Sequence, residues 1–304
     1  MNNIVTILLA TYNGAEYLED QLKSIVEQDY SGWKLIISDD GSSDNTKDLI
    51  ERYISRNPHL DINLINGPQK GFSHNFLNML QNVNTEYTCF CDQDDVWLPT
   101  KLSASINKIK SLEVPALFCA RTTLINNNGE TIGYSPLFKL MPSFCNALVQ
   151  NIAGGNTMLF NLSARELLQS AYNPKLQLVS HDWWAYQILS GSSGVVYYDE
   201  TPNVLYRQHK RNLIGSNRFF WNRIVRLRLL LSGEYKRWIK INLIALQSAN
   251  WCLTPQNQKI LSLFIKLRKA NLIQRILLMR NLKLYRQTKI GNAALFVIIL
   301  FNLL

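Results

Sequence analysis

The sequence of 304 residues is poor in cysteine, and its five cysteines are odd in number and show no paired spacing. A disulfide framework is therefore not expected, and this usage fits a reducing compartment. Cys89 and Cys91 flank Phe90 with the alternation of a strand, so we interpret them as packing residues. Because no second cysteine pair accompanies them, a structural zinc site is also not expected.

Two nucleotide-binding signatures are missing as well. No Gly-x-Gly-x-x-Gly follows the first apolar run, and no Gly-x-x-x-x-Gly-Lys-Ser/Thr occurs anywhere. Interpretation as a dinucleotide-dependent dehydrogenase or a P-loop kinase therefore loses most of its support.

Long apolar runs are missing at both ends of the sequence. The first 14 residues have no basic leader, and their apolar run is too short for a signal peptide, so we expect a first strand there. The apolar segment 293–304 has 12 residues, fewer than the roughly 20 that a membrane-spanning helix needs. We expect it either to dip into a membrane surface or to pack on the core.

Acidic residues are nearly absent from the last third of the chain. Residues 207–304 carry 19 Lys/Arg and the single acid Glu234, a balance of +18, whereas residues 1–206 carry 13 Lys/Arg and 21 Asp/Glu, a balance of −8. The cations of the basic part alternate with Leu, Ile and Trp at helical spacing, which is typical of amphipathic helices on an anionic membrane face. A nucleic acid would also attract this charge, but the bulky aliphatic content favours a membrane. A helical bundle with a solvated basic face is the third interpretation.

The first hundred residues alternate strand and helix patterns. Strands are expected at 4–10, 33–39, 62–66 and 87–91, and helices at about 15–28, 44–56 and 72–82. This alternation predicts an α/β fold with a mostly parallel central sheet flanked by helices, followed by a basic helical section. Ligands of such sheets bind beyond the carboxyl ends of the strands.

Polar residues follow three of these predicted strands at their carboxyl ends. They are Thr11, Tyr12 and Asn13, then Asp39 and Asp40, then Asp92, Asp94 and Asp95 in the stretch FCDQDDVWLP. Asp44, by contrast, is expected to cap the second helix, with Gly41 allowing the turn before it. Three strands are thus predicted to bring polar side chains to one edge of the sheet.

The three carboxylates of FCDQDDVWLP predict a divalent cation. Two unit charges about 4 Å apart repel by roughly 4 kcal/mol at an effective dielectric near 20, so a positive partner is expected. Mg²⁺ and Mn²⁺ prefer oxygen ligands and share their coordination with substrate phosphates. The alternative is a solvated loop in which Asp94 or Asp95 caps the helix that Pro99 and residues 101–110 indicate.

Seven segments, taken in order, resemble the family 2 glycosyltransferases with their nucleotide-sugar-binding GT-A fold. They are LLATYNGAEYLEDQLKSIVEQ, ISDDGSSDNT, GFSHNF, FCDQDDVWLPTKL, NIAGGNTMLF, HDWWAYQ and LYRQHKRNLIG, and they cover about residues 4–215. DQDDVWLP, HDWW and YRQH are similar to the bacterial subgroup that assembles O-antigen and capsular polysaccharides, many of whose members are labelled rhamnosyltransferases. We therefore expect a GT-A domain over 1–215 and a basic, membrane-associating helical region over 216–304.

The resemblance implies that three strand-end residues line the nucleotide pocket: Thr11, Tyr12 and Asn13. Asp40, together with Asp39, is expected to accept a hydrogen bond from the pyrimidine. Gly71 and Asn75 are expected in the segment that closes over the nucleotide.

Within the carboxylate stretch, the resemblance places Asp92 near the ribose and Asp94 on the metal, with Asp95 supporting them. The implied metal is Mn²⁺ or Mg²⁺. Such an ion neutralises the charge that builds on the departing diphosphate when the anomeric bond breaks.

Asp182 in HDWWAYQ occupies the family position of the catalytic base, and His181 stands where the family usually has Glu. From the residues alone, Asp182 is simply a helix N-cap. As a base it would accept the proton of the acceptor hydroxyl in a single displacement, so inversion at the anomeric carbon is expected. His181 and Trp183 are expected near the donor or acceptor sugar, although Trp183 and Trp184 cannot share a helix face, so one of them belongs to the core.

Gly154, Gly155 and Asn156 are expected to form a loop close to a sugar, the alternative being an ordinary turn. His209 in LYRQHKRN is either a structural histidine or an additional metal ligand. Arg207, with Lys210 and Arg211 nearby, is expected to bind the diphosphate because guanidinium groups suit phosphate oxygens.

Together these features predict an inverting, metal-dependent glycosyltransferase. The donor is expected to be dTDP- or UDP-linked, with rhamnose as one candidate sugar, and the acceptor a growing, polyprenyl-diphosphate-linked glycan. The protein is expected in the cytoplasm, peripheral at the inner face of the membrane, and without a nucleic-acid partner. The alternatives are a non-catalytic nucleotide-sugar-binding module, against which the presence of both Asp94 and Asp182 argues, and a nucleic-acid-binding protein that uses residues 207–304.

Overall fold

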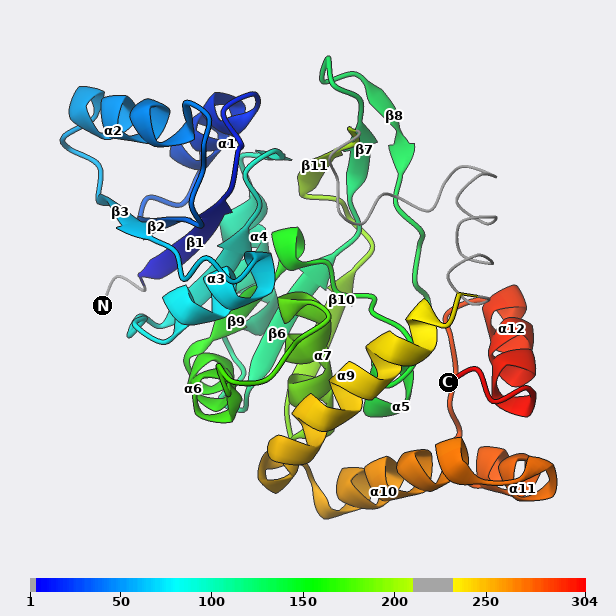
Figure 1. The fold of residues 1–304 in the computed structure, drawn as a ribbon. Coiled ribbons are helices and arrows are strands. Elements are labelled where there is room, and N and C mark those ends of the chain that lie inside the picture. The colour runs from blue at the N-terminus through cyan, green and yellow to red at the C-terminus, as the bar shows by residue number, and fades with distance from the viewer. Residues whose placement is uncertain (1–3, 210–231) are drawn as a thin grey trace.

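The computed structural model describes residues 4–209 and 232–304. Its centre is a seven-stranded sheet with the strand order β10-β6-β9-β4-β1-β2-β3 (Figure 1). The strands are β1 (Val5–Thr11), β2 (Trp33–Asp39), β3 (Ile62–Asn66), β4 (Tyr87–Cys91), β6 (Ala116–Ala120), β9 (Leu159–Asn161) and β10 (Val195–Asp199). β1 to β4 run parallel to their neighbours among these four, and β10 is parallel to β6. β9 alone runs antiparallel, between β4 and β6.

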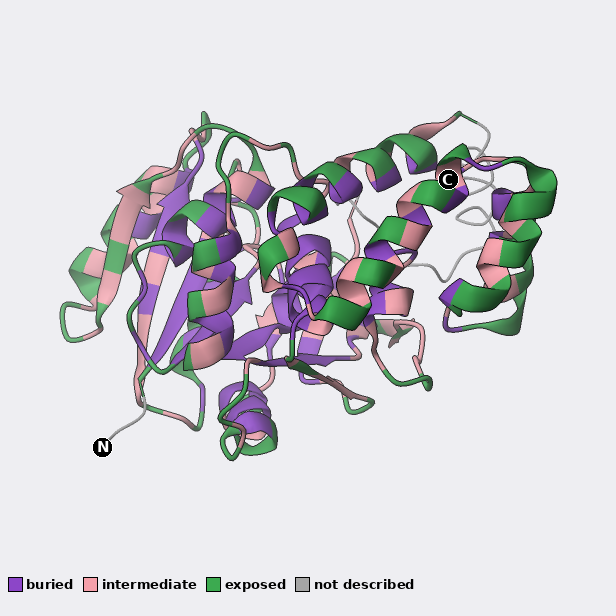
Figure 2. Cartoon of the chain, turned by 90° about the horizontal axis from the view of Figure 1, so that it is seen from below, coloured by how far each residue is buried: buried purple, intermediate pink, exposed green. Residues whose placement is uncertain are grey.

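Two hydrophobic cores cover the two faces of this sheet because successive side chains of a strand point to opposite sides. Leu8 of β1 belongs to the core under α3 (Phe72–Leu80), α6 (Leu162–Ala171) and α7 (His181–Gly191). Its neighbours Ile7 and Leu9 belong to the core under α1 (Leu18–Val26), α2 (Thr46–Arg56) and α4 (Lys101–Ile109). Figure 2 shows the buried residues concentrated in the strands of the large sheet.

A second, smaller sheet has the order β5-β11-β7-β8. Its strands are β5 (Val96–Trp97), β7 (Thr123–Ile125), β8 (Thr131–Tyr134) and β11 (Val204–Arg207). β11 pairs antiparallel with β5, with Leu205 opposite Val96, and parallel with β7. Because β5 directly follows the carboxylate stretch, this pairing brings the end of β11 beside it.

All seven elements predicted in the first hundred residues are present, with helices a few residues shorter than expected. The predicted caps need correction. The N-cap of α4 is Thr100, so neither Asp94 nor Asp95 caps that helix. The N-cap of α7 is Ser180, and Asp182 is the second residue of the helix.

The start of α2 differs from the prediction in the same way. Asn45, not Asp44, is the N-cap residue. Asp44 still binds the first turn, since its carboxylate accepts a hydrogen bond from the Thr46 N–H at 3.0 Å. Burial alone would raise the pKa of Asp44, but the hydrogen bonds from Thr46 and Ala15 lower it below its usual value.

The C-terminal section is helical, as predicted, over the residues that the structure describes. Residues 232–304 contain α9 (Glu234–Ser248), η2 (Asn250–Cys252), α10 (Pro255–Lys269), α11 (Leu272–Leu282) and α12 (Lys289–Leu300). α9 lies across α7 and shares its core through Ile239, Leu243 and Leu246 (Figure 1). The predicted boundary at 215/216 lies outside the described residues.

Only one side of the apolar segment at the end of the chain packs on the core. Within α12, Leu295, Ile298 and Ile299 are buried, whereas Phe296 and Val297 are exposed. Across residues 4–209 and 232–304, no helix combines the length and the hydrophobicity needed to cross a bilayer.

Candidate active site

The loops after β1 and β2 bind one another at the carboxyl edge of the sheet. The Thr11 hydroxyl donates to Asp39 Oδ2 at 3.0 Å, and Asn13 Oδ1 accepts from the Ser43 N–H at 2.8 Å. The other oxygen of Asp39 accepts from the N–H groups of Gly41 and Ser42 at 3.1 and 2.8 Å. Asp39 is therefore a buried residue that holds this turn, next to the predicted pyrimidine contact at Asp40.

Asp40 lies in a second cluster, together with the segment that leads into α3. Its two oxygens accept from the N–H groups of Gln69 and Gly71 at 2.6 and 2.8 Å. Gly71 has φ +84°, which glycine adopts without strain, and it precedes α3 as its N-cap. Asn75 is buried in that helix and binds the backbone carbonyl and the hydroxyl of Ser38 at 2.8 and 2.6 Å. Asp40, Gly71 and Asn75 are thus brought together, with Asn75 serving the packing of α3 on β2.

The carboxylate stretch lies at the same edge, after β4. Asp95 is buried, and it accepts from Asn156 Nδ2 at 2.6 Å and from the Arg207 N–H at 3.1 Å. Burial, together with the charges of Asp94 and Asp92, raises the pKa of Asp95 well above its usual value. Burial likewise raises the pKa of Asp92 to about 8, followed by the charges of Asp94 and Asp182. A bound cation would relieve this repulsion and favour the ionised carboxylates.

The Asp94 and His209 side chains form the best candidate for metal ligation. His209 Nε2 lies 2.8 Å from Asp94 Oδ2, and the imidazole stacks on Tyr17 with the ring centroids 5.1 Å apart. Two neighbouring ligands of an octahedral Mg²⁺, each about 2.0 to 2.1 Å from the ion, lie roughly 3 Å apart, so this spacing fits a shared ion. Within the described part of the chain, no group of three or more His, Cys, Asp or Glu forms a closed metal site. The fit is therefore to an ion that takes its remaining ligands from diphosphate and water.

Arg207 holds the carboxylate stretch in place. The side chain is 3% exposed and donates to the Asp94 carbonyl at 3.0 Å, the Asn127 carbonyl at 2.9 Å and Asp20 Oδ2 at 2.8 Å. Its guanidinium carbon lies 4.6 Å from the centre of the Tyr17 ring. Its donors are thus directed to protein acceptors, which corrects the expectation that it faces the diphosphate. Lys210 and Arg211 lie outside the described residues.

Asp182 joins the start of α7 to the turn that precedes β9. Its Oδ1 accepts from the Trp183 N–H at 2.6 Å, and its Oδ2 accepts from the Gly155 N–H at 3.3 Å. Gly155 begins the turn η1 (Gly155–Thr157), which reaches this edge because β9 runs antiparallel. The charge of Asp182 contributes to the raised pKa of Asp92, so the predicted base lies near the carboxylate stretch.

His181 is a packing residue. It is 4% exposed and lies among Phe72, Phe76 and Phe90, with its ring centroid 4.1 Å from that of Phe76. Burial lowers its pKa to about 4, although Asp182 acts in the opposite direction. A Cβ atom on Gly155 would approach His181 Nε2 to 2.6 Å, so the glycine is required by this contact. The expectation that His181 contacts a sugar is corrected.

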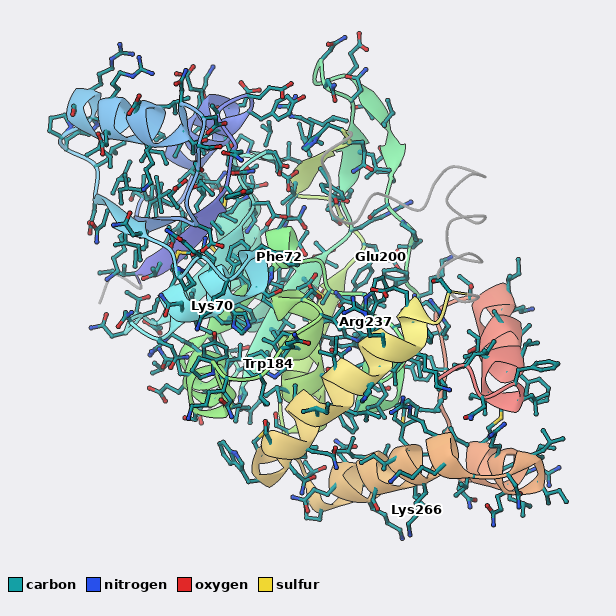
Figure 3. The ribbon with its side chains drawn as sticks, in the orientation of Figure 1. Lys70, Phe72, Trp184, Glu200, Arg237 and Lys266 are labelled. Carbon is teal, nitrogen blue, oxygen red and sulfur yellow. The ribbon has the colours of Figure 1, made fainter. Side chains whose placement is uncertain are left out.

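Both tryptophans at the start of α7 are also buried. Trp183 is 6% exposed and its indole N–H donates to the Ala147 carbonyl at 2.7 Å, while Trp184 is 2% exposed. This corrects the expectation that Trp183 stacks on a sugar ring. Figure 3 shows Phe72 at the start of α3, above Trp184.

Sequence reasoning missed Gln93, the middle residue of the Asp-x-Asp pattern. Its side chain accepts from the Tyr12 N–H at 2.9 Å and donates to the Tyr12 carbonyl at 3.1 Å. A Cβ on Gly14 would lie 2.0 Å from Gln93 Oε1, so a larger residue at position 14 would displace the Gln93 side chain from Tyr12. No sequence signal links positions 81 residues apart. Tyr12 itself is 59% exposed, and its contact with a nucleotide stays a prediction.

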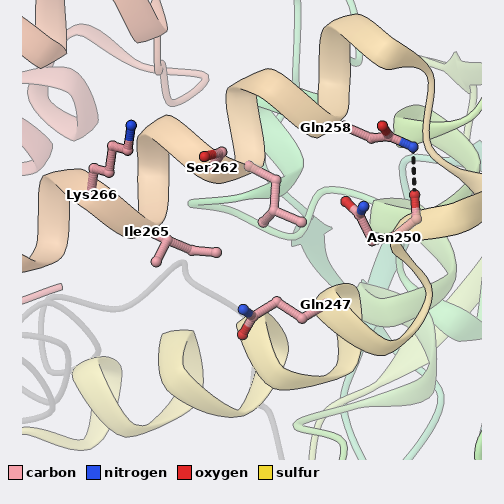
Figure 4. Close-up of a pocket in the computed structure, with 7 residues that line it drawn as sticks. Gln247, Asn250, Gln258, Ser262, Ile265 and Lys266 are labelled. Carbon is pink, nitrogen blue, oxygen red and sulfur yellow. Dashed lines mark hydrogen bonds between the residues drawn. The ribbon is translucent and has the colours of Figure 1, made fainter.

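Two hollows lie elsewhere, along α10. One, of about 410 Å³, opens between α9 and α10 and is lined by Gln247, Asn250, Gln258, Leu261, Ser262, Ile265 and Lys266 (Figure 4). The other, of about 460 Å³, lies between α10 and α11 and is lined by Lys266, Lys269, Ala270, Gln274, Leu277 and Leu278. Neither hollow is lined by a carboxylate, in contrast to the edge of the sheet with Asp92, Asp94, Asp95 and Asp182.

A family model described as glycosyl transferase family 2 matches residues 6–168, which is more than half of the chain. The chain belongs to glycosyl transferase family 2. Its α/β architecture, with the mostly parallel sheet and the C-terminal helices, is the GT-A-like fold that the resemblance predicted. A binding module without activity and a nucleic-acid-binding protein are not favoured.

Two curated relatives are bacterial glycosyltransferases. The dTDP-rhamnosyl transferase RfbG of Shigella flexneri is 29% identical over 242 residues, which cover 75% of this chain and 81% of RfbG. The UDP-Glc:alpha-D-GlcNAc-diphosphoundecaprenol beta-1,3-glucosyltransferase WfgD of Escherichia coli is 27% identical over 125 residues, 41% of this chain and 48% of WfgD.

Solved structures share the fold at low identity. S. aureus TarS 1-349 in complex with UDP has a TM-score of 0.53 and 16% identity, over 79% of this chain and 65% of that chain. The mannosyltransferase PcManGT from Pyrobaculum calidifontis, in complex with GDP-Man and Mn²⁺, has a TM-score of 0.52 and 18% identity, over 98% of this chain and 84% of that chain.

Proposed function

We propose that this glycosyltransferase is metal-dependent and inverting, and that it transfers a sugar from a dTDP- or UDP-linked donor to a polyprenyl-diphosphate-linked glycan. The observation that carries the proposal is the 2.8 Å contact between Asp94 and His209 at an edge that also holds Asp182. Rhamnose is the first candidate sugar, because RfbG is named a dTDP-rhamnosyl transferase. The acceptor class is supported by the diphosphoundecaprenol in the name of WfgD.

Asp94 and His209 would hold the ion, and Asp92 and Asp95 would complete its negative surroundings. When bound, Mn²⁺ or Mg²⁺ supplies Lewis-acid stabilisation to the leaving diphosphate. Tyr12, Asn13 and Asp40, on the loops after β1 and β2, would contact the nucleotide. The donor would then be oriented with its diphosphate toward the end of β4.

Asp182 would remove the proton of the acceptor hydroxyl. The N–H groups of Trp183 and Gly155 fix its carboxylate, one on each oxygen, and leave lone pairs free for that hydroxyl. The acceptor oxygen then attacks the anomeric carbon from the side opposite the diphosphate. A single displacement of this kind inverts the configuration. The protein would work in the cytoplasm, peripheral at the inner face of the membrane where a polyprenyl carrier is anchored.

The donor site is tested by thermal unfolding with dTDP, UDP, GDP or CMP, each with Mn²⁺, Mg²⁺ or chelator. A nucleotide at about 100 times its dissociation constant stabilises the protein by roughly 2.7 kcal/mol. We expect this shift with dTDP or UDP only when the metal is present, and we expect Asp94→Ala to abolish the metal-dependent part. If the metal makes no difference with any nucleotide, the metal role of Asp94 is wrong.

The base is tested by Asp182→Asn. The amide can still bind the Gly155 N–H but cannot take a proton, so transfer should fall by about 10² to 10⁴ while the dTDP or UDP shift stays. Asp61→Asn, at an exposed carboxylate remote from the edge, is the control. Normal transfer by Asp182→Asn, measured as sugar incorporated into a lipid-linked acceptor, would remove the base assignment.

A further inference from the structure

We infer that α11, α12 and the cationic end of α10 form one membrane-binding surface, which inserts apolar side chains among anionic lipids. This inference deepens the proposed membrane location and rests on it for the class of partner. The surface is defined by the exposed apolar residues Leu272, Ile273, Ile276, Leu277, Ile290, Phe296, Val297 and Phe301 and by the exposed cations Lys266, Lys269, Arg280, Lys283 and Lys289.

α11 touches the core along one side only, through Leu282 and the partly buried Leu278 and Met279. Only Leu282 of its 11 residues is buried, although its sequence LIQRILLMRNL is largely apolar. Ile273 is 72% exposed and Leu277 is 56% exposed. A helix that packs on a soluble core normally buries its apolar stripe, and a contiguous exposed apolar patch marks an interaction site.

α12 divides its apolar residues between two faces. One face packs on the core through Leu295, Ile298 and Ile299, while Ile290 and Phe301 at its two ends are 77% and 72% exposed. Figure 2 shows exposed residues along the outer sides of the helices at this end of the molecule. α11 and α12 contact each other, so the two helices that carry these exposed side chains are neighbours in the fold.

The charge of this region fits an anionic partner. Residues 235–304 contain no Asp or Glu, so no acidic residue lies on α10, α11 or α12 beside the exposed cations. Each Lys or Arg near an anionic bilayer strengthens binding roughly fivefold. The combination of cations with exposed Ile, Leu and Phe suits a bilayer interface, in which both can be satisfied.

The hollow between α10 and α11 has the same mixed chemistry on a smaller scale. Lys266 and Lys269 stand on one side and Leu277 and Leu278 on the other, around a volume of about 460 Å³. Two ammonium groups beside an apolar wall match a phospholipid headgroup and the first part of its chains. Figure 3 places Lys266 far from Phe72, so lipid binding there leaves the edge with Asp94 and Asp182 free.

The test is flotation of the full chain with neutral phosphatidylcholine vesicles and with vesicles containing phosphatidylglycerol. We expect binding to the anionic vesicles and little to the neutral ones. Ile273→Glu and Leu277→Glu should abolish flotation, and the double variant Lys266→Gln/Lys269→Gln should weaken it about tenfold or more. The matched controls are Leu162→Glu, at a side chain 41% exposed on α6, and Lys175→Gln, and both should float like the unchanged protein.

Folding of every variant is checked by its thermal shift with dTDP or UDP and metal, which should be unchanged. If Ile273→Glu and Leu277→Glu float normally, the proposed surface is wrong. If the protein instead binds duplex DNA of any sequence at the same salt, or if Ile273→Glu converts a dimer to a monomer without affecting vesicle binding, the partner is wrong. A nucleotide shift without flotation would overturn this inference alone, whereas flotation without a nucleotide shift would overturn the proposed function alone.

Discussion

His181 is a buried imidazole that stays neutral in the folded protein, next to Asp182, the candidate catalytic base. Its pKa is about 4 in the folded chain against about 6.5 in an unfolded chain. Between these two pH values the unfolded state binds more protons, so stability falls as the pH falls. The contribution of neutral His181 to the free energy of unfolding is complete above about pH 6.5, and it is lost as the pH drops through about 4.

From this we predict that the free energy of unfolding of His181→Leu depends less on pH below about 6.5. The lowered pKa of His181 corresponds to a loss of about 3 kcal/mol between pH 6.5 and 4, and the variant should not show this loss. Urea unfolding at intervals from pH 7 to 4.5 measures the difference between the variant and the unchanged protein, and His59→Gln, at an exposed histidine, is the control. An identical slope in His181→Leu would mean that this imidazole is not the titrating group.

At the scale of residues, the sequence predicted where polar side chains lie in the fold better than it predicted which groups they bind. Asp39, Asn75 and Arg207 all lie at or behind the predicted edge, yet their polar atoms are bound to Ser42, Ser38 and the Asp94 carbonyl. A sequence shows which side chains can make hydrogen bonds, but the fold decides which partners reach them first. Asp94 and Asp182 differ because each keeps an oxygen able to receive a further partner.

At the scale of elements, β11 holds the carboxylate stretch after β4 in place, although the two segments are far apart in the sequence. Its last residue, Arg207, ties together the carboxylate stretch, Asp20 of α1 and Asn127 in the turn between β7 and β8. The strands and helices of the first hundred residues were predictable because each rests on local periodicity. The pairing of β11 with β5 and β7 was not, since it depends on contacts about a hundred residues apart.

We predict that Arg207→Lys weakens metal binding without removing it. An ammonium cannot reach three acceptors in the fixed geometry of a guanidinium, and residues that orient metal ligands typically change affinity 10- to 100-fold. The measurement is the Mn²⁺ concentration that gives half of the thermal shift with dTDP or UDP. Arg237→Lys, at an exposed ion pair with Glu234, should leave it unchanged. An unaltered Mn²⁺ dependence in Arg207→Lys would show that the loop is held by other contacts.

At the scale of the molecule, the basic section and the catalytic part share a core. Leu246 of α9 is fully buried in the cluster that contains Trp184 and Phe90, and the Tyr235 hydroxyl donates to the Val149 carbonyl at 2.8 Å. The composition of the section predicted basic amphipathic helices. It did not predict which apolar residues pack inward, because that choice depends on the surface of α7.

The shared core predicts that Leu246→Ala destabilises the whole chain. Removing a buried leucine costs about 2 to 5 kcal/mol, and the loss should appear in one cooperative transition that also responds to donor nucleotide. Ile244→Ala, at a side chain 46% exposed on the same helix, should change stability by no more than about 0.5 kcal/mol. Calorimetry that resolved a separate, nucleotide-responsive transition unaffected by Leu246→Ala would show that α9 unfolds independently.

The antiparallel direction of β9 has a consequence for how this enzyme can change over evolution. Because β9 enters the sheet from the edge that holds Asp94 and Asp182, the segment before it, with Gly154 to Asn156, lies at the candidate active site, while Asn161 at its far end passes directly into α6. Insertions upstream of this strand would therefore alter the acceptor side of the site. Insertions after β9, where the chain enters α6, would lie at the opposite edge of the sheet and leave the candidate active site unchanged. Changes before and after this short strand can therefore accumulate independently of each other.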